Sequence, residues 1–273
     1  MRKLFAHIRN LAMYRIDKSA EAAYQALVRL LHHVSSIFVA PYQFAPDYEI
    51  RLKGSVRAEK ILQRARNRRT KYGIPFWDAV ILEGMTTGPI DESILDGALY
   101  HQSTGETLLE VSRNDVLGIG IVATVEKAGI PYPWAVLSRV RADDGTEYHF
   151  PMLDFRCPIS EANLMSLQRV AERLLDCPWV LIESECSYHL LGASLLSDRE
   201  LAKFFGASIL FGPLVDRNYV AHQLLNGSGA LRIVSVAGKT GLKTRVTTFP
   251  HNAWGDSSQL KSSAEKGSDG EKA

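Results

Sequence analysis

The chain has 273 residues, of which 46% are hydrophobic, so it is long enough to bury the core of one large domain or two small ones. Its formal net charge is only +2, so no global basic field indicates a nucleic-acid-binding protein. No apolar run approaches the roughly 20 residues that a membrane-spanning helix needs, and the basic start lacks the pattern of a signal peptide.

The three cysteines, Cys157, Cys177 and Cys186, form no C-x-x-C pair. This spacing argues against a structural zinc site and against a secreted fold built on disulfides. Reduced thiols are typical of the cytosol. We therefore expect a cytoplasmic protein without membrane contact.

The first 115 residues are expected to be a mainly helical and irregular N-terminal region. Apolar residues at three- and four-residue spacing predict a helix from Ser19 to Ile37. The basic segment 51–71 is predicted to be helical over 55–70, with its few apolar residues buried. A short strand is expected at Ala79–Leu82, followed by an irregular, polar stretch over 84–114.

The signals are sharper from Trp134 onward. Trp134–Val140 and Tyr148–Arg156 are predicted to be the strands of a hairpin, because Asp144-Gly145 supplies the positive φ angles of a tight turn. Helix caps are predicted at Ser160, Ser197 and Asp216, and further strands at 179–183, 188–196, 208–211, 231–234 and 245–249.

These elements predict an α+β fold with a mixed β-sheet core over residues 116–253 and helices packed on it. The mainly helical N-terminal region precedes this core. Residues 254–273 have almost no apolar side chains, so we expect a disordered tail.

Asp154 ends an otherwise apolar strand. Strand alternation puts Met152, Asp154 and Arg156 on one face. A carboxylate in this position can hold a metal ion at the edge of a sheet, or it can cap backbone amides near Cys157. The residues themselves leave both interpretations open.

Ser187 and His189 share one strand face, and Tyr188 points the other way. The serine and histidine could bind a phosphate or a ribose hydroxyl, although a lone histidine on an apolar strand is more often a satisfied core residue. Glu183 and Glu185, which precede them, are expected to bring carboxylates near His189.

Asp216 is placed to cap the helix that follows it, and can join a site only if its second carboxylate oxygen faces that site. Downstream, Arg232 lies on a strand and Lys243 in a loop that contains glycine. Both supply cations for a triphosphate, but the loop lacks the spacing of a Walker A motif.

In their order, these three segments resemble the catalytic core of archaeo-eukaryotic primases and primase-polymerases, over about Trp134 to Phe249. In that family an acid-x-acid strand binds two divalent metals, Ser-x-His contacts the incoming nucleotide, and an apolar-acid segment completes the metal site. The resemblance implies catalytic residues Asp154, His189 and Asp216, a Mg²⁺ or Mn²⁺ site at Asp154 and Asp216, and nucleotide-binding residues Ser187, His189, Arg232 and Lys243.

The chain departs from the family at Arg156, which stands where the second acid of the first motif is expected. A guanidinium is always charged, so we expect it to pair with Asp154 and leave the metal site incomplete. Two-metal catalysis needs ligands for both ions. Polymerase activity is therefore expected to be lost or strongly reduced, unless Glu183 or Glu185 replaces the missing acid.

The basic segment provides a second candidate surface. Its predicted nucleic-acid-binding residues are Arg64, Arg66, Arg68 and Arg69. The alternative is an ordinary solvated helix face. Tyr72 and Trp77 lie close by and are expected either to stack on bases or to belong to the core.

Three functions agree with these observations. The first is a primase-like protein with a degenerate metal site, which binds nucleotide or nucleic acid in DNA replication, repair, or a mobile-element or defence system. The second is an active divalent-metal-dependent nucleotidyltransferase that uses a substitute carboxylate. The third is a non-catalytic subunit that binds another protein. The expected partners are nucleic acid and a nucleoside triphosphate, and the residues leave open whether the chain is an enzyme.

Overall fold

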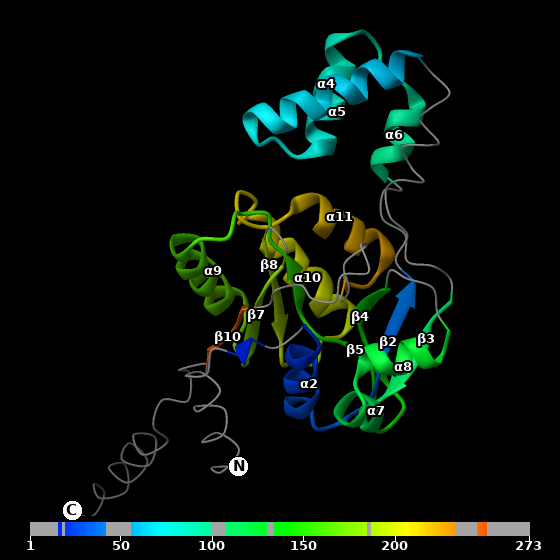
Figure 1. The fold of residues 1–273 in the computed structure, drawn as a ribbon, viewed down its shortest axis with the longest axis vertical. Coiled ribbons are helices and arrows are strands. Elements are labelled where there is room, and N and C mark those ends of the chain that lie inside the picture. The colour runs from blue at the N-terminus through cyan, green and yellow to red at the C-terminus, as the bar shows by residue number, and fades with distance from the viewer. Residues whose placement is uncertain are drawn as a thin grey trace, which may run out of the picture.

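The structure is a computed structural model that describes residues 16–17, 20–41, 56–99, 107–129, 134–184, 187–232 and 245–249 (Figure 1). The strands are β1 (Ile16–Asp17), β2 (Val34–Pro41), β3 (Leu109–Ser112), β4 (Trp134–Ala142), β5 (Glu147–His149), β6 (Met152–Asp154), β7 (Trp179–Glu183), β8 (Tyr188–Gly192), β9 (Ala230–Arg232) and β10 (Arg245–Phe249). The helices are α2 (Ala20–Leu30), α4 (Val56–Tyr72), α5 (Phe76–Thr86), α6 (Glu92–Leu99), α7 (Arg113–Gly118), α8 (Ile121–Lys127), α9 (Glu161–Leu174), α10 (Asp198–Ile209) and α11 (Arg217–Asn226). Within these ranges no helix has the length and apolar character needed to cross a membrane.

The strands form two sheets, and helices pack on them, which confirms the α+β class. One sheet has the order β1-β10-β7-β8-β6, and the other has the order β3-β2-β4-β5. Strand β9 pairs with the first half of β4, beside β5 along the same edge. Each pairing between described strands is antiparallel.

The return strand predicted over Tyr148–Arg156 is two strands in different sheets. The N–H of Phe150 donates to the carbonyl of Ser138 in one sheet, at 2.9 Å, while the carbonyl of Pro151 accepts from the N–H of Gly192 in the other, at 2.8 Å. Proline has no N–H with which to continue the first ladder. The chain therefore changes sheets at Phe150-Pro151 and places β6 beside β8.

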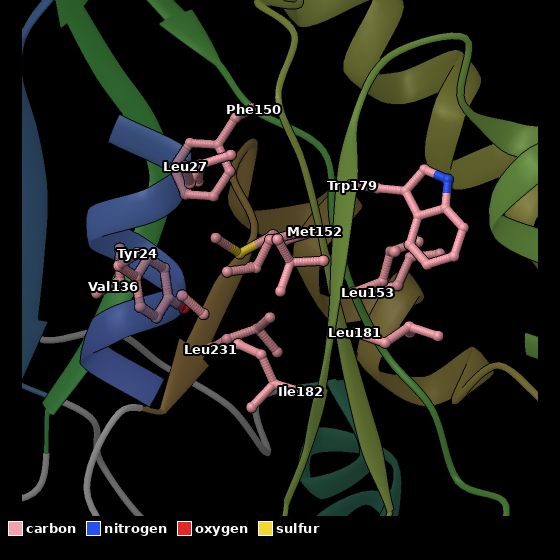
Figure 2. Close-up of a cluster of buried hydrophobic side chains, with 14 of the residues drawn as sticks. Tyr24, Leu27, Val136, Phe150, Met152, Leu153, Trp179, Leu181, Ile182 and Leu231 are labelled. Carbon is pink, nitrogen blue, oxygen red and sulfur yellow. The ribbon is translucent and has the colours of Figure 1, made fainter. Parts of the chain in front are cut away.

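The main core lies between the two sheets. Figure 2 shows Met152, Ile182 and Leu231 in this space, next to side chains of α2. Leu153 and Leu181 project to the opposite face of the β6-β8-β7 sheet, as the period of two in a strand requires. The same alternation decides which side chains of β6 and β8 face inward.

The N-terminal part of the chain differs from the prediction. The expected helix Ser19–Ile37 ends at Leu30, and the β-branched and aromatic residues from Val34 onward form β2 instead. Strands β2 and β3 pair with each other, and β2 pairs with β4. Residue 115 therefore does not divide a helical region from the sheet core, because long-range pairing joins the two.

Residues 56–99, which we call the helical insert, form a group of three helices beside α11 (Figure 1). The predicted helix over 55–70 is confirmed as α4. Ala79–Leu82, predicted to be a strand, lies inside α5, and 84–114 contains α6 and β3, so both predictions were wrong. The insert has its own buried cluster, made of Ile61, Leu62, Ala65, Trp77, Ala79, Val80 and Ile94. A short apolar run does not by itself distinguish a strand from a buried helix turn.

Several local predictions in the second half are confirmed. Ser160 and Ser197 cap α9 and α10, and Ser197 forms a full capping box with Glu200. The strand predicted over Ser208–Phe211 was wrong, because α10 continues to Ile209 and a turn follows. Cys157 and Cys177 are free and buried, whereas Cys186 and the predicted tail 254–273 lie outside the described residues.

Candidate nucleotide and cation site

Asp154 and His189 lie side by side on the inner face of the β6-β8-β7 sheet. The register pairs Asp154 with His189, and His189 with Ile182, which lies between the sheets (Figure 2). Residues directly opposite each other on neighbouring strands share a face. Nε2 of His189 is 3.6 Å from Oδ1 of Asp154, which is too long for a good hydrogen bond.

Asp216 reaches the same place from another part of the chain. An isolated bridge joins Phe155 to Val215, and the N–H of Asp216 donates to the carbonyl of Asp154 at 3.0 Å. Oδ1 of Asp216 accepts the N–H groups of Asn218 and Tyr219, so the predicted cap of α11 is confirmed. Its Oδ2 accepts no hydrogen bond from the residues that the structure describes.

Burial and neighbouring charge control protonation in this site. Burial, and after it the charge of Asp216, raises the pKa of Asp154 to about 8, although Arg232 acts in the opposite direction. Burial lowers the pKa of His189 to about 4, and Arg232 acts in the same direction. At neutral pH Asp154 is therefore mostly protonated and His189 is neutral.

These shifts predict how stability depends on pH. The folded state holds the proton of Asp154 more tightly than the unfolded chain does, so this stabilising contribution is lost as pH rises from about 4 to about 8. We expect the free energy of unfolding of the wild type, minus that of Asp154→Asn, to fall over this range. For His189→Gln the corresponding difference should rise between pH 4 and 6.5, since the unfolded imidazole binds protons more readily.

Urea denaturation of the two variants and the wild type at half-unit pH steps measures both differences. If the free energy of unfolding of the wild type minus that of Asp154→Asn did not change with pH, the raised pKa of the Asp154 carboxyl would be contradicted.

Ser187 lies at the margin of the site, where its hydroxyl donates to the carbonyl of Phe155. Tyr188 points to the opposite face, since its hydroxyl bonds to both the N–H and the carbonyl of Ser160. The role of Ser187 in phosphate binding stays a prediction, and Lys243 lies outside the described residues.

Glu183 does not bring a carboxylate to His189, contrary to expectation. It pairs with Tyr188 in the register of β7 and β8, so its side chain belongs to the face that carries α9. The prediction from the sequence assigned Glu183 to the wrong face of the sheet. The residue opposite on the neighbouring strand determines the face, and the separation along the chain does not. Glu185 lies outside the described residues.

Arg156 also behaves differently from the prediction. It forms no ion pair with Asp154, because β6 ends at Asp154 and strand alternation does not extend to residue 156. Its guanidinium donates from Nη2 to the carbonyl of Gly73 in the helical insert, at 3.1 Å. The N–H of Arg156 bonds to the carbonyl of Leu214. Arg156 therefore links the strand to the insert.

Asp154 and Asp216 are the residues that would hold a divalent cation. The charge of Asp216 disfavours ionisation of Asp154, and a bound cation would offset the repulsion between the two carboxylates. Within the described parts of the chain, no three His, Cys, Asp or Glu side chains form a group suited to a metal ion. Two protein carboxylates with water or phosphate oxygens are a common way to hold Mg²⁺.

His222 is a further neighbour of Asp216, and no motif in the sequence indicates it. It is buried on α11, where burial lowers its pKa, the charge of Asp216 raises it, and a hydrogen bond to the backbone of Leu99 also raises it. Its position six residues after the capping aspartate was the only local signal. It ties α11 to the end of the helical insert.

The arginines predicted to bind nucleic acid are not equivalent in the structure. Both Nε and Nη2 of Arg68 contact one oxygen, Oε1, of the buried Glu83, at 2.6 Å and 2.5 Å. Arg64, Arg66 and Arg69 are exposed on α4. Arg68 thus has an intramolecular partner inside the insert, although its role toward nucleic acid stays a prediction.

Comparison with known proteins bears on this geometry. Residues 132–241 match the family model described as archaeo-eukaryotic primase 1D-like. No curated protein matches the chain, and no solved structure does. The matched range contains Asp154, His189, Asp216 and Arg232, and it confirms the resemblance drawn from the sequence. Over residues 132–241 the chain is therefore similar to the archaeo-eukaryotic primase-like family.

Proposed function

We propose that this primase-like protein binds a nucleoside triphosphate with one divalent cation, Mg²⁺ or Mn²⁺, at the site formed by Asp154, His189, Asp216 and Arg232. The observation that carries the proposal is the convergence of these residues from β6, β8, the start of α11 and β9. Separate segments supply carboxyl groups, an imidazole and a guanidinium to one place, which is the donor set that a metal-bound phosphate requires.

Each residue has a role that its chemistry supports. Asp154 and Asp216 hold the cation, which neutralises phosphate charge when it is bound. The neutral imidazole of His189 donates a hydrogen bond to a phosphate oxygen or a sugar hydroxyl. Arg232 supplies positive charge to the phosphates, and Ser187 and Lys243 remain candidates for the same role.

Polymerisation is expected to be absent or weak. Arg156 supplies no third carboxylate, and Glu183 lies on the opposite face of the sheet. Two carboxylates are suited to one divalent cation, whereas nucleotidyl transfer uses two divalent cations. A binding role in replication, repair, or a mobile-element or defence system is therefore favoured over an active nucleotidyltransferase or a purely protein-binding subunit.

The test is the equilibrium binding of fluorescently labelled ATP and dATP to the full chain, with Mn²⁺, with Mg²⁺ and with EDTA. Cation-dependent binding that Asp216→Asn weakens at least tenfold is the expected result. Binding that is equal in EDTA would contradict the proposal. Template-directed incorporation of nucleotides that Asp154→Asn abolishes would show that the chain is an active nucleotidyltransferase.

A further inference from the structure

A row of cations follows one side of α4. Lys60, Arg64 and Lys71 are four and seven residues apart, which places them on the same side of the helix. All three are exposed, and none forms an ion pair with a residue that the structure describes. Lys60 and Lys71 are separated by about 16 Å along the helix axis, which is enough for several phosphates of a strand. We call these three residues the basic row.

An exposed aromatic ring stands at the end of the basic row. Tyr72 is the last residue of α4 and is 61% exposed. The amine of Lys71 lies 5.0 Å from the centre of its ring. The next aromatic residues, Phe76 and Trp77, belong to the apolar cluster of the insert, where Trp77 is buried and Phe76 packs against it. Tyr72 is therefore the aromatic residue that α4 offers to a ligand.

This end of α4 is held against the nucleotide and cation site by two contacts. Arg156, two residues after Asp154, donates to the carbonyl of Gly73, which directly follows Tyr72. Arg217, the residue after Asp216, lies 3.9 Å from Asp78 at the start of α5. The α4–α5 region is thus joined to residues that follow both aspartates of the site in the sequence.

We propose that the basic row binds the phosphates of a single-stranded nucleic acid, that Tyr72 stacks on one of its bases, and that Arg156 places this base at the rim of the nucleotide site. This inference deepens the proposed function. The strand's placement next to a bound nucleotide rests on that function, whereas the binding of the strand itself does not. Stacking on an exposed ring requires an unpaired base, which a duplex offers only at its ends. The residue that replaces the expected acid in the first motif therefore acts as a positioning residue for the strand.

The first test measures the binding of fluorescent 12-nucleotide pyrimidine strands, DNA and RNA, to the full chain by anisotropy. The variant Lys60→Glu/Arg64→Glu/Lys71→Glu is expected to lose at least tenfold in affinity. The slope of log affinity against log salt concentration should become less negative by about 0.7 for each phosphate that the variant no longer binds. The control Arg169→Glu/Arg173→Glu/Lys203→Glu changes the same charge on the exposed surfaces of α9 and α10. Equal losses in both variants would overturn the proposal.

The second test isolates stacking. Tyr72→Ala is expected to weaken strand binding about fivefold or more, while Tyr72→Phe stays within twofold, because the ring and not the hydroxyl does the stacking. A duplex of the same length without overhangs should be insensitive to Tyr72→Ala. Equal binding of strands to the alanine and wild-type chains would overturn the role of Tyr72.

The third test locates the stacked base. A strand with a terminal 4-thiothymidine is crosslinked by light, and the adducts are mapped by mass spectrometry. Adducts at residues 72–78, 154–156 or 216–217 support the proposal, and adducts confined to other segments overturn it. Strand binding that depends on Tyr72, combined with no triphosphate binding, would sink the proposed function and leave this inference standing.

Discussion

Cation-dependent triphosphate binding is expected to strengthen about fiftyfold between pH 6 and pH 8. A cation can occupy Asp154 only after the carboxyl releases its proton, and the pKa of that carboxyl is about 8. The ionised fraction then rises from about one in a hundred at pH 6 to about one half at pH 8. His189 does not titrate in this window because its pKa lies near 4.

The measurement is isothermal titration with Mn²⁺ and a non-hydrolysable triphosphate, in buffers of different ionisation enthalpy, from pH 6 to pH 8. About one proton should be released for each cation bound at pH 6.5. Asp154→Asn should bind weakly and lose the pH dependence, whereas Asp176→Asn, an exposed control, should keep it. An unchanged pH slope in Asp154→Asn would exclude this carboxyl as a cation ligand.

Arg68→Ala is expected to destabilise the helical insert by about 2 kcal/mol, whereas Arg64→Ala changes stability by less than about 0.5 kcal/mol. Removing Arg68 leaves Glu83, whose side chain is only 8% exposed, without its guanidinium. The loss stays below that of a fully buried pair, because the Arg68 side chain is 37% exposed and solvent screens its charge. Arg64 has no such partner among the described residues.

Hydrogen exchange of the α4 and α5 amides gives the local free energy of opening in both variants. The order of the two variants should reverse for strand binding under strongly native conditions. Arg64→Ala should bind the strand more weakly than the wild type, and Arg68→Ala should bind it about as well as the wild type. Stronger exchange in Arg64→Ala than in Arg68→Ala would contradict the contact between Arg68 and Glu83.

The three motifs of the site were recognisable because each depends on a few neighbouring residues. Asp154 ends an apolar strand, Ser187 and His189 alternate with Tyr188, and Asp216 caps a helix by bonding amides two and three residues ahead. The order of these segments was enough to indicate the primase-like family. The functional roles of the individual residues stay predictions.

The wrong predictions concern residues whose positions depend on contacts with distant segments of the chain. Glu183 has the spacing of a residue near His189, but its pairing with Tyr188 sends it to the other face. Arg156 was expected beside Asp154, but the strand ends first and the carbonyl of Gly73, from a segment 83 residues away, accepts its hydrogen bond. No local pattern contains these partners.

By itself the sequence determined the caps of α9, α10 and α11, the amphipathic α4 and the alternation of β8, because hydrogen bonds and apolar spacing within a few residues suffice for them. Only the tertiary structure decided that the chain changes sheets at Phe150-Pro151. This change lets Asp154 meet His189 and Asp216, and the hydrogen bond from Arg156 to the carbonyl of Gly73 joins the end of α4 to the same strand. Such placements depend on register and packing between segments far apart in the chain, which short-range patterns do not encode.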